Sequence, residues 1–321
     1  LPIPTWTPGK DAAPYITTIT VTHNADTGHQ NMGVYRTMIV DDTHVLANLS
    51  PGRHGFIQAS TYLDKGRPAP IAWVIGAEPA VHFATVANLP FDEDEIAVAG
   101  GLMGAPVELV KCKTNDLLVP ANAEIIIEGE VLPGEDEDEG PFGEFAGYMG
   151  PIGPKPKARI TAITHRKDAI YYGLASQMPP SESTTLQSLS NAPLLLKILR
   201  HDFGETSVQD VSIDLTFGGL LAHCIVSLAP KYAGHAKEIG RLIADLSPIK
   251  RVTVVDDYVD VRDPLHMEWA MSSHYNPVRD TVIIEDVYFP MGIDPSVGIN
   301  DGKTEFGSKV VIDATRTFDA G

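Results

Sequence analysis

Two glutamates separated by a short, constrained turn are the residues of this chain best placed for acid/base chemistry. They stand in Glu139-Gly-Pro-Phe-Gly-Glu144, which Phe-Ala-Gly-Tyr follows. Gly and Pro fix the backbone of such a turn, so both carboxylates point in set directions, as proton transfer requires. The stretch also continues an acidic run over residues 135–139. A solvated acidic loop is the ordinary interpretation of such a run, and composition alone favours it.

Asn31 and Arg36 lie in a second polar stretch, residues 23–36 (HNADTGHQNMGVYR). Asn31 precedes a glycine-containing segment whose backbone amides are candidates to face a phosphate. Arg36 falls in the strand expected next, where its planar guanidinium suits a carboxylate. A single arginine in a strand is more often a surface residue, so Arg36 alone indicates little.

His54 and Glu95 are candidate metal ligands. His54 follows Ser50-Pro-Gly-Arg, and Glu95 ends the acidic patch Asp92-Glu-Asp-Glu. A lone histidine is usually structural or exposed, and Glu95 also suits a helix N-terminus. Together with Asn31 they form an oxygen and nitrogen set that fits Mn²⁺ or Mg²⁺ better than structural zinc. The sequence has no Cys-x-x-Cys, HExxH, P-loop, dinucleotide fingerprint or GxSxG nucleophile elbow.

The first half of the chain must position these residues, and its pattern predicts short strands joined by Gly, Pro and Asp turns. The strands are expected at residues 15–22, 33–40, 44–49, 70–76, 124–130, 158–165 and 169–174, with helices at 54–65 and 93–102. Such a series is typical of a barrel or a sandwich.

The pattern changes near Pro179-Pro180. Apolar residues then recur at helical spacing, and strands alternate with helices, which indicates an α/β unit. We expect helices at residues 192–200, 233–246 and 264–272, and strands at 219–228, 251–255 and 281–286. A domain boundary is therefore predicted near residue 180, followed by a connecting helix.

Composition limits the partners and the compartment. The 321 residues carry a net charge of −18, from 42 acidic and 24 basic side chains, and Lys and Arg are scattered. This excludes an ordinary nucleic-acid surface. Cys112 and Cys224 are expected to be buried free thiols of a reducing compartment. No membrane-spanning run and no charged signal-peptide region are visible, so we expect a cytoplasmic protein with no membrane partner.

Four blocks, in this order along the chain, resemble the UbiD family of prenylated-FMN-dependent decarboxylases. They are Gln30-Asn-Met-Gly-Val-Tyr-Arg36, Lys111-Cys-Lys-Thr-Asn-Asp-Leu-Leu-Val-Pro-Ala121, Glu139-Gly-Pro-Phe-Gly-Glu-Phe-Ala-Gly-Tyr148 and Tyr232-Ala-Gly-His-Ala-Lys237. The segments Asp256-Asp-Tyr-Val-Asp260, Trp269-Ala-Met-Ser-Ser273 and Gly307-Ser-Lys309 agree as well. Each block is weak by itself, but their joint order is specific, and the resemblance covers essentially the whole chain.

The resemblance implies an α+β fold. Residues 1–180 would form a split β-barrel domain that binds prenylated FMN, and residues 181–321 a linker helix with an α/β oligomerisation domain. Family members usually carry a further α/β segment before the barrel and a helical tail after the last strand. Neither is visible here, so we expect a core of the enzyme or one subunit of a split enzyme.

The resemblance also implies the roles of individual residues. Asn31, His54 and Glu95 would bind the divalent metal that bridges to the flavin phosphate, with K⁺ beside it at backbone carbonyls such as that of Met32. Arg36, Glu139 and Glu144 would be the catalytic network, with Glu144 as the proton donor and Arg36 as the partner of the substrate carboxylate. The implied cofactor-binding residues are Asn31, Met32, Gly33, Val34, Tyr35, Arg36, Arg53, His54, Met178 and Lys231.

The implied function is reversible, non-oxidative decarboxylation of an aromatic, heteroaromatic or α,β-unsaturated acid. It would proceed through a covalent adduct with prenylated FMN and protonation by a glutamic acid. The partners implied are the carboxylic acid, carbon dioxide, a flavin prenyltransferase that supplies the cofactor, and further copies of the chain in a dimer or hexamer. Two alternatives stay open: an FMN oxidoreductase, and a silent or partner-dependent subunit of a multi-subunit carboxylase.

Overall fold

The protein is described by a computed structural model that covers residues 1–215, 223–288, 296–297 and 306–318. The chain divides into two units. The first comprises Leu1–Glu144 and Met149–Gln177, and the second comprises Phe145–Tyr148 and Met178–Gly321. Each unit has its own sheet and its own core, and each is described separately below.

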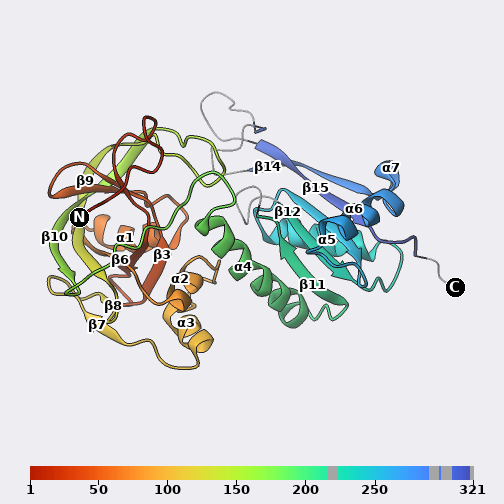
Figure 1. Cartoon of the computed structure of the whole chain (residues 1–321), viewed down its shortest axis with the longest axis horizontal. Helices are drawn as coiled ribbons and strands as arrows, with labels where there is room; N and C mark the ends of the chain where they lie inside the picture. Colours follow the sequence, from red (N-terminus) through yellow and green to blue (C-terminus); the bar gives the residue numbers. More distant parts are fainter. Residues whose placement is uncertain (216–222, 289–295, 298–305, 319–321) are drawn as a thin grey trace. The chain divides into compact units, whose positions relative to one another are not determined.

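An eight-stranded antiparallel sheet forms the first unit, in the strand order β1-β4-β5-β10-β9-β6-β2-β3. The strands are β1 (Tyr15–Ile16), β2 (Ile19–His23), β3 (Gln30–Val34), β4 (Thr37–Ile39), β5 (His44–Ala47), β6 (Ala69–Ile75), β9 (Ile125–Glu139) and β10 (Gly153–His165). The sheet curls, and its long strands β9 and β10 lie side by side (Figure 1). A separate ribbon pairs β7 (Leu109–Lys111) with β8 (Leu118–Pro120).

Both faces of strand β6 are buried, and different helices cover them. Ile71, Trp73 and Ile75 face one cluster that includes residues of α1 (His54–Leu63). Ala72 and Val74 face another cluster, with residues of α2 (Pro79–Thr85) and α3 (Glu95–Met103). Alternate side chains of a strand point to opposite faces, so an unbroken apolar strand requires cover on both sides. The continuous run APIAWVI therefore specifies this arrangement.

The hairpin of β9 and β10 carries the acidic turn. Its register sets Glu139 opposite Gly153 and continues to Ile125 opposite His165, with irregularities between Pro156 and Ala158 and between Ile160 and Ala162. Such irregularities increase local twist and bend the strands. The hairpin thus extends the sheet beyond its neighbours and places Glu139 at the end of β9.

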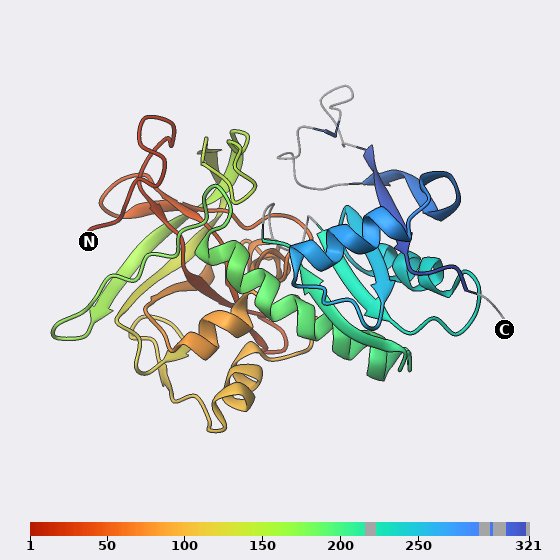
Figure 2. The ribbon, with the colours of Figure 1, turned by 45° about the vertical axis from the view of Figure 1, so that its right-hand side comes forward.

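The second unit contains a five-stranded mixed sheet in the order β11-β12-β13-β15-β14. Its elements are α4 (Glu182–Lys197), a π-helical turn (Ile198–Asp202), β11 (Val208–Ile213), β12 (His223–Leu228), α5 (His235–Leu246), β13 (Arg251–Asp256), α6 (Pro264–Ser273), α7 (Pro277–Asp280), β14 (Thr281–Tyr288) and β15 (Phe306–Ala314). The β12-β13-β15 pairs are parallel, and β11 and β14 pair antiparallel at the edges. Residues of α4 and α5 contribute to one apolar cluster of this sheet, and Ala270 of α6 contributes to another. Figure 2 shows the ribbon of this unit from a second side.

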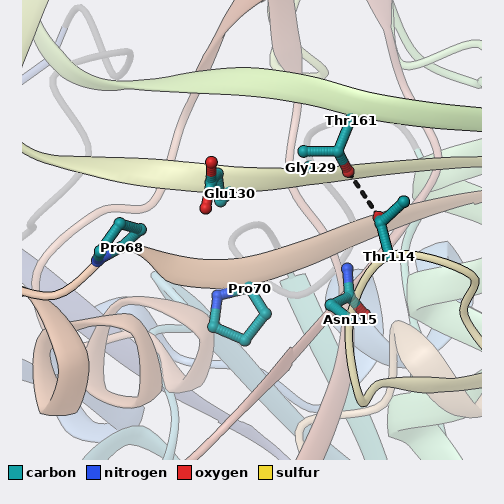
Figure 3. Close-up of a pocket in the computed structure, with 7 residues that line it drawn as sticks. All are labelled: Pro68, Pro70, Thr114, Asn115, Gly129, Glu130 and Thr161. Carbon is teal, nitrogen blue, oxygen red and sulfur yellow. Dashed lines mark hydrogen bonds between the residues drawn. The ribbon is translucent and has the colours of Figure 1, made fainter.

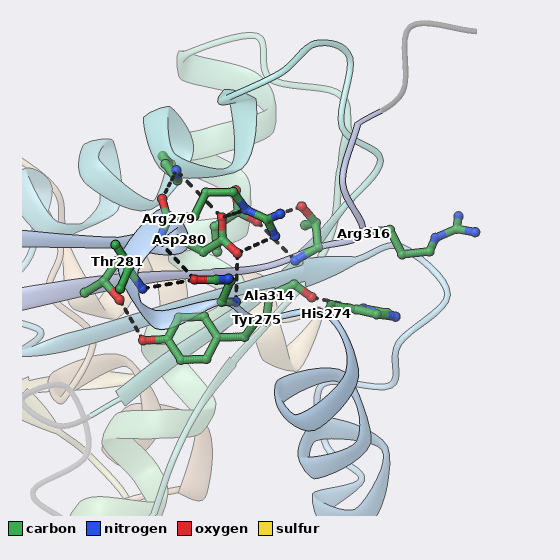
Figure 4. Close-up of polar contacts among 12 residues, drawn as sticks. His274, Tyr275, Arg279, Asp280, Thr281, Ala314 and Arg316 are labelled. Carbon is green, nitrogen blue, oxygen red and sulfur yellow. Dashed lines mark hydrogen bonds and ion pairs between the residues drawn. The ribbon is translucent and has the colours of Figure 1, made fainter.

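Polar contacts fix the end of the second unit around α7 (Figure 4). Asp280 is buried and accepts hydrogen bonds from the Arg279 guanidinium at 2.7 Å, from both Nε and Nη2. The Tyr275 hydroxyl contacts Thr281 Oγ1 at 2.6 Å, and His274 Nδ1 lies 3.3 Å from the carbonyl oxygen of Ala314. Buried polar groups with hydrogen-bond partners stabilise a single arrangement. These contacts therefore tie α6 and α7 to the ends of β14 and β15.

The expected α+β fold is confirmed, while several element boundaries differ. The strand expected at residues 15–22 is two strands, β1 and β2, because Thr17 turns inward and donates to the carbonyl oxygen of Leu174 at 2.7 Å. The strand expected at 169–174 is absent, and this segment has no regular secondary structure. Helix α2 and strands β7, β8, β11 and β15 were not predicted. The expected strand at 219–228 is observed from His223, and 219–222 lie outside the described residues.

The structure also bears on the two cysteines and on membrane-spanning helices. Cys112 and Cys224 are both free and buried, as expected. Among the described residues, the helices are too short or too polar to cross a lipid bilayer.

Two helical glycines should respond in opposite ways to alanine. A Cβ at Gly240 in α5 would lie 2.3 Å from Cγ1 of Val311, a stiff β-branched side chain, whereas a Cβ at Gly101 in α3 meets nothing within 4 Å. We expect Gly240→Ala to lower the free energy of unfolding by about 1–3 kcal/mol. We expect Gly101→Ala to raise it by about 0.5–1 kcal/mol through helix propensity.

Hydrogen exchange of the α5 and α3 amides in each variant measures the two effects locally. Equal protection in Gly240→Ala and the unsubstituted protein would contradict the close packing of α5 on β15.

Candidate active site

Arg36, Glu139 and Glu144 form one ion-paired group in the first unit. The guanidinium of Arg36 donates from Nε and Nη2 to the two carboxylate oxygens of Glu139, each at 2.8 Å, and Nη1 pairs with Oε1 of Glu144. The Glu139 side chain is fully buried, and those of Arg36 and Glu144 are 12% exposed. A bidentate pair of this kind fixes both partners in direction as well as distance. The structure thus brings together the three residues predicted to be catalytic.

The elements that hold Arg36 come from both ends of the sheet. Arg36 lies between β3 and β4, and its carbonyl oxygen accepts from the backbone N–H of Asn48 at 3.0 Å. Its guanidinium carbon lies 5.2 Å from the centre of the Phe142 ring, which in turn packs at 4.5 Å against the ring of Tyr15. A cation over an aromatic face is stabilised electrostatically. Phe142 thus holds the turn against the same guanidinium that its flanking glutamates bind.

The turn between the two glutamates is anchored on several sides. The N–H of Gly143 donates to Asp11 at 2.9 Å, and its carbonyl accepts from Gln177 Nε2 at 2.9 Å. The N–H of Gly150 donates to the Phe142 carbonyl at 2.7 Å. A Cβ at position 150 would lie only 2.9 Å from Oε1 of Glu144. Glycine at this position therefore lets the backbone cover the ion pair without displacing the carboxylate.

Burial separates the acidic run from the acidic turn. Residues 135–138 are exposed, whereas Glu139 is buried and ion-paired. The interpretation of the whole stretch as a solvated loop is thus wrong from Glu139 onward. A carboxylate so deep in a protein is retained only when charged groups and hydrogen bonds compensate for its lost hydration.

Asn31 and Glu95 meet at strand β3. Oε2 of Glu95 accepts from the backbone N–H of Met32 at 3.1 Å, and Glu95, Asn31 and Met32 are all buried. Nδ2 of Asn31 has no hydrogen-bond partner among the described residues. Burial raises the pKa of Glu95 to about 7. A bound cation would favour the ionised carboxylate and compensate for its burial.

His54 is held near the same strand by Tyr35. The hydroxyl of Tyr35 accepts from the N–H of Gly55 at 3.0 Å, and its ring fills the space where a Cβ at Gly33 or Gly55 would lie. His54 is the first residue of α1, so this contact joins the start of α1 to the residues next to Arg36. Burial, aided by the neighbouring Arg53 and His29, lowers the pKa of His54. The neutral imidazole is the form that binds metals.

Phe91 also contacts His54, and this contact was not predicted. The two rings meet edge to face, with their centres 5.0 Å apart. Phe91 stands in the polar loop between α2 and α3, where an aromatic residue has no periodic pattern to reveal its contact.

The three predicted metal ligands lie on β3 and at the starts of two helices that pack on it. His54 and Glu95 are the first residues of α1 and α3, and both helices pack on β3. Helix N-termini carry partial positive charge and favour phosphate. The described residues contain no group of three or more His, Cys, Asp or Glu side chains suited to a metal. The predicted set has only two such side chains and relies on the amide of Asn31 for a third ligand.

Met178 and Lys231 belong to the second unit. Met178 is exposed, and its sulfur packs over Gly147. The ammonium of Lys231 pairs with Glu205 at 2.7 Å, and its backbone N–H contacts Nδ1 of the buried His235 at 3.2 Å. Both remain predicted cofactor contacts, and the same holds for Val34 and the exposed Arg53 in the first unit.

Two cavities lie away from the predicted residues. One, of about 80 Å³, is lined by Pro68, Pro70, Asn115 and Glu130 and by the hydrogen-bonded pair Thr114 and Thr161 (Figure 3). The other, of about 910 Å³, lies in the second unit between α4, the sheet and α6. None of the predicted catalytic, metal or cofactor residues lines either cavity.

Comparison with protein families assigns both units to one family. Residues 1–179 match the 3-octaprenyl-4-hydroxybenzoate carboxy-lyase Rift-related domain, UbiD. Residues 184–314 match the 3-octaprenyl-4-hydroxybenzoate carboxy-lyase C-terminal domain, UbiD_C.

Solved structures agree over nearly the whole chain. The UbiD-class enzyme HmfF from Pelotomaculum thermopropionicum, in complex with FMN, is 34% identical, with a TM-score of 0.87 over 99% of this chain and 69% of its own. The vanillic acid decarboxylase of Sedimentibacter hydroxybenzoicus is 28% identical, with a TM-score of 0.85 over 97% of this chain and 66% of its own. The 3,4-dihydroxybenzoic acid decarboxylase of Enterobacter cloacae is 25% identical, with a TM-score of 0.86 over 99% and 68%.

These relatives share the fold and are carboxy-lyases or members of the same enzyme class, and this chain spans about two thirds of their length. With both family models matched in order and the Arg36, Glu139 and Glu144 group assembled, the chain belongs to the UbiD family of prenylated-FMN-dependent decarboxylases.

Proposed function

We propose that this chain catalyses the reversible, non-oxidative decarboxylation of an aromatic, heteroaromatic or α,β-unsaturated carboxylic acid. The observation that carries the proposal is the buried arginine between two glutamates, which is a ready-made carboxylate-binding and proton-transfer group. Relatives of known activity support the substrate class, since two of them are decarboxylases of vanillic acid and of 3,4-dihydroxybenzoic acid.

The two glutamates take different parts in this proposal. Glu139 uses both oxygens to hold Arg36, so its task is to orient the guanidinium and balance its charge. Glu144 pairs through Oε1 and is less deeply buried, so it is the better proton donor. Two acids beside one arginine can hold different protonation states, and one donates a proton while its neighbour stays charged.

Arg36 still has donors for a substrate. Three of its five N–H groups point at the glutamates, through Nε, Nη2 and Nη1. The remaining two can hold the substrate carboxylate close to Glu144. Loss of carbon dioxide leaves an electron pair on the substrate carbon, and prenylated FMN supplies the electron sink for it when bound. Glu144 then delivers a proton to the same carbon.

The cofactor set follows from the residues around β3. Asn31, His54 and Glu95 would hold Mn²⁺ or Mg²⁺, and the N-termini of α1 and α3 favour the flavin phosphate beside it. K⁺ would bind at backbone carbonyls such as that of Met32. FMN and prenylated FMN occur in the HmfF structures, which supports this cofactor here.

The proposal extends to partners and location. A flavin prenyltransferase would supply the cofactor, and the enzyme would act in the cytoplasm as a homo-oligomer. An evolved form of HmfF is described as dimeric, which supports self-association in this class.

A partner-dependent subunit is the second candidate. The vanillic acid decarboxylase was solved as ShVdcCD, and one of its structures contains a truncated ShVdcD. On this alternative the chain alone binds the flavin without turnover, and a second component restores activity. An FMN oxidoreductase is a third candidate, and it would have no need of Glu144.

Cofactor release is the first test. The protein should be co-expressed with a flavin prenyltransferase, supplied with Mn²⁺ and denatured, and the mass of the released cofactor measured. We expect prenylated FMN, together with carbon dioxide release from aromatic or acrylic acids. Plain FMN alone would favour the oxidoreductase, and a protein without flavin would contradict cofactor binding by this chain.

Glu144→Gln should abolish proton transfer while leaving the site assembled. Gln keeps the shape of Glu144 but cannot donate the proton, so we expect kcat to fall by about 10²–10⁴-fold, with prenylated FMN still bound. The matched control is Glu137→Gln, because Glu137 is an exposed glutamate of β9, the strand that leads into the turn, and it pairs with Lys157. Turnover of Glu144→Gln equal to that of the control would remove Glu144 from the mechanism.

Glu95→Gln should weaken metal binding. The change removes the charged member of the set around β3, so we expect the Mn²⁺ affinity to fall at least about 10-fold, with loss of flavin during gel filtration. Glu93→Gln, an exposed substitution two residues away, should bind Mn²⁺ as the unsubstituted protein does. Electron paramagnetic resonance of free Mn²⁺ measures both, and equal affinity in the two variants would contradict a metal at Glu95.

A further inference from the structure

Lys155 is a half-buried cation without a carboxylate of its own. It makes no ion pair with any carboxylate that the structure describes, and its ammonium lies 3.4 Å from the hydroxyl of Ser50. Lys157, two residues along the same strand, pairs with Glu137 at 2.5 Å. A lysine held away from solvent without an ion pair is unusual, because desolvation of an ammonium costs free energy.

The hairpin of β9 and β10 places Lys155 between two ion pairs. In its register Lys155 lies opposite Glu137, and Gly153 lies opposite Glu139. Glu137 is bound by Lys157 and Glu139 by Arg36. Residues directly opposite in an antiparallel pair, and those diagonal to them, are within reach of long side chains. The register therefore places Lys155 diagonal to Glu139 across the hairpin.

A chain of hydrogen bonds also connects Lys155 with Arg36. Lys155 donates to Ser50 Oγ, Ser50 Oγ donates to Oδ1 of Asn48 at 2.8 Å, and the N–H of Asn48 donates to the Arg36 carbonyl at 3.0 Å. Ser50 and Asn48 follow β5, so this strand and β10 hold the lysine in a set position relative to the arginine.

The group of Arg36, Glu139 and Glu144 has more negative than positive charge when both glutamates are ionised, so a second cation nearby would stabilise it. Arg36 brings one positive charge to two carboxylates, Glu139 and Glu144, in a site with little solvent. Two other described side chains interact electrostatically here, Tyr15 of β1 with Glu139 and Asp11 with Tyr15, and neither of them adds positive charge. Burial lowers the pKa of Lys155, Glu139 opposes that shift, and Arg36 adds to it, so the three groups interact electrostatically.

We infer that Lys155 is a positioning residue of the acid/base network, which supplies the second positive charge that lets Glu139 stay ionised while Glu144 exchanges its proton. The catalytic part of this inference rests on the proposed function. The interaction of Lys155 with the carboxyl groups, however, can be measured without any turnover.

The test is proton uptake by the network in the flavin-free and metal-free protein. Glutamate carboxyl bands are followed by isotope-edited infrared spectroscopy across pH, with Glu139→Gln and Glu144→Gln used to assign them. Without the lysine charge the two carboxyls hold a proton more readily. In Lys155→Met we therefore expect their protonation to occur at higher pH, by on the order of one pH unit. Lys155→Arg should restore the original profile.

Lys157→Met is the matched control, because it removes the same charge from the same strand but from an outer ion pair. It should leave the network bands unchanged. In the flavin-loaded enzyme, Lys155→Met should move the pH profile of kcat in the same direction. A Lys155→Met profile that overlays the original, or an equal displacement in Lys157→Met, overturns the inference. If no acid is decarboxylated and the bands still move, the proposed function fails while the role of Lys155 stands.

Discussion

The pairing of one buried arginine with two glutamates is the constraint on which the first unit depends. Charges in a protein interior are tolerated only with near-complete compensation, so Arg36 and its partners must reach their positions together. Three separate features serve this end: the β9 and β10 hairpin carries Glu139 inward, the glycine turn returns Glu144 to the same guanidinium, and Phe142 covers its face. The curled sheet is the frame that brings these distant segments to one point.

Strand β3 and the segment after it connect the ion-paired group with the starts of α1 and α3. Their residues contact Glu95 at the start of α3, Gly55 at the start of α1 and, through Arg36, the acidic turn. The residues that we propose for proton transfer and for cofactor binding are therefore adjacent in sequence, over residues 31–36. This proximity explains why the block Gln30–Arg36 is so informative in the sequence.

The sequence predicted those parts of the site that turn residues or ordered motifs mark. It did not predict features that depend on strand pairing. The turn residues around Glu139 and the ordered blocks indicated the three residues that form the ion-paired group, but composition could not separate the exposed residues 135–138 from buried Glu139. That difference arises only when β9 pairs with β10. The sequence pattern does not single out Lys155, because its neighbours come from β9 and from the segment after β5. The segment 169–174 has strand-forming residues but no strand partner in the described sheet, so tertiary context overrode propensity.

The place of β3 at the end of the eight-stranded sheet has a further consequence for solubility. An edge strand presents unpaired N–H and C=O groups, and such edges recruit strands of other molecules into aggregates. Here the N–H of Met32 is occupied by the carboxylate of Glu95. Glu95, the residue that we propose as a metal ligand, therefore also covers an N–H group at a sheet edge.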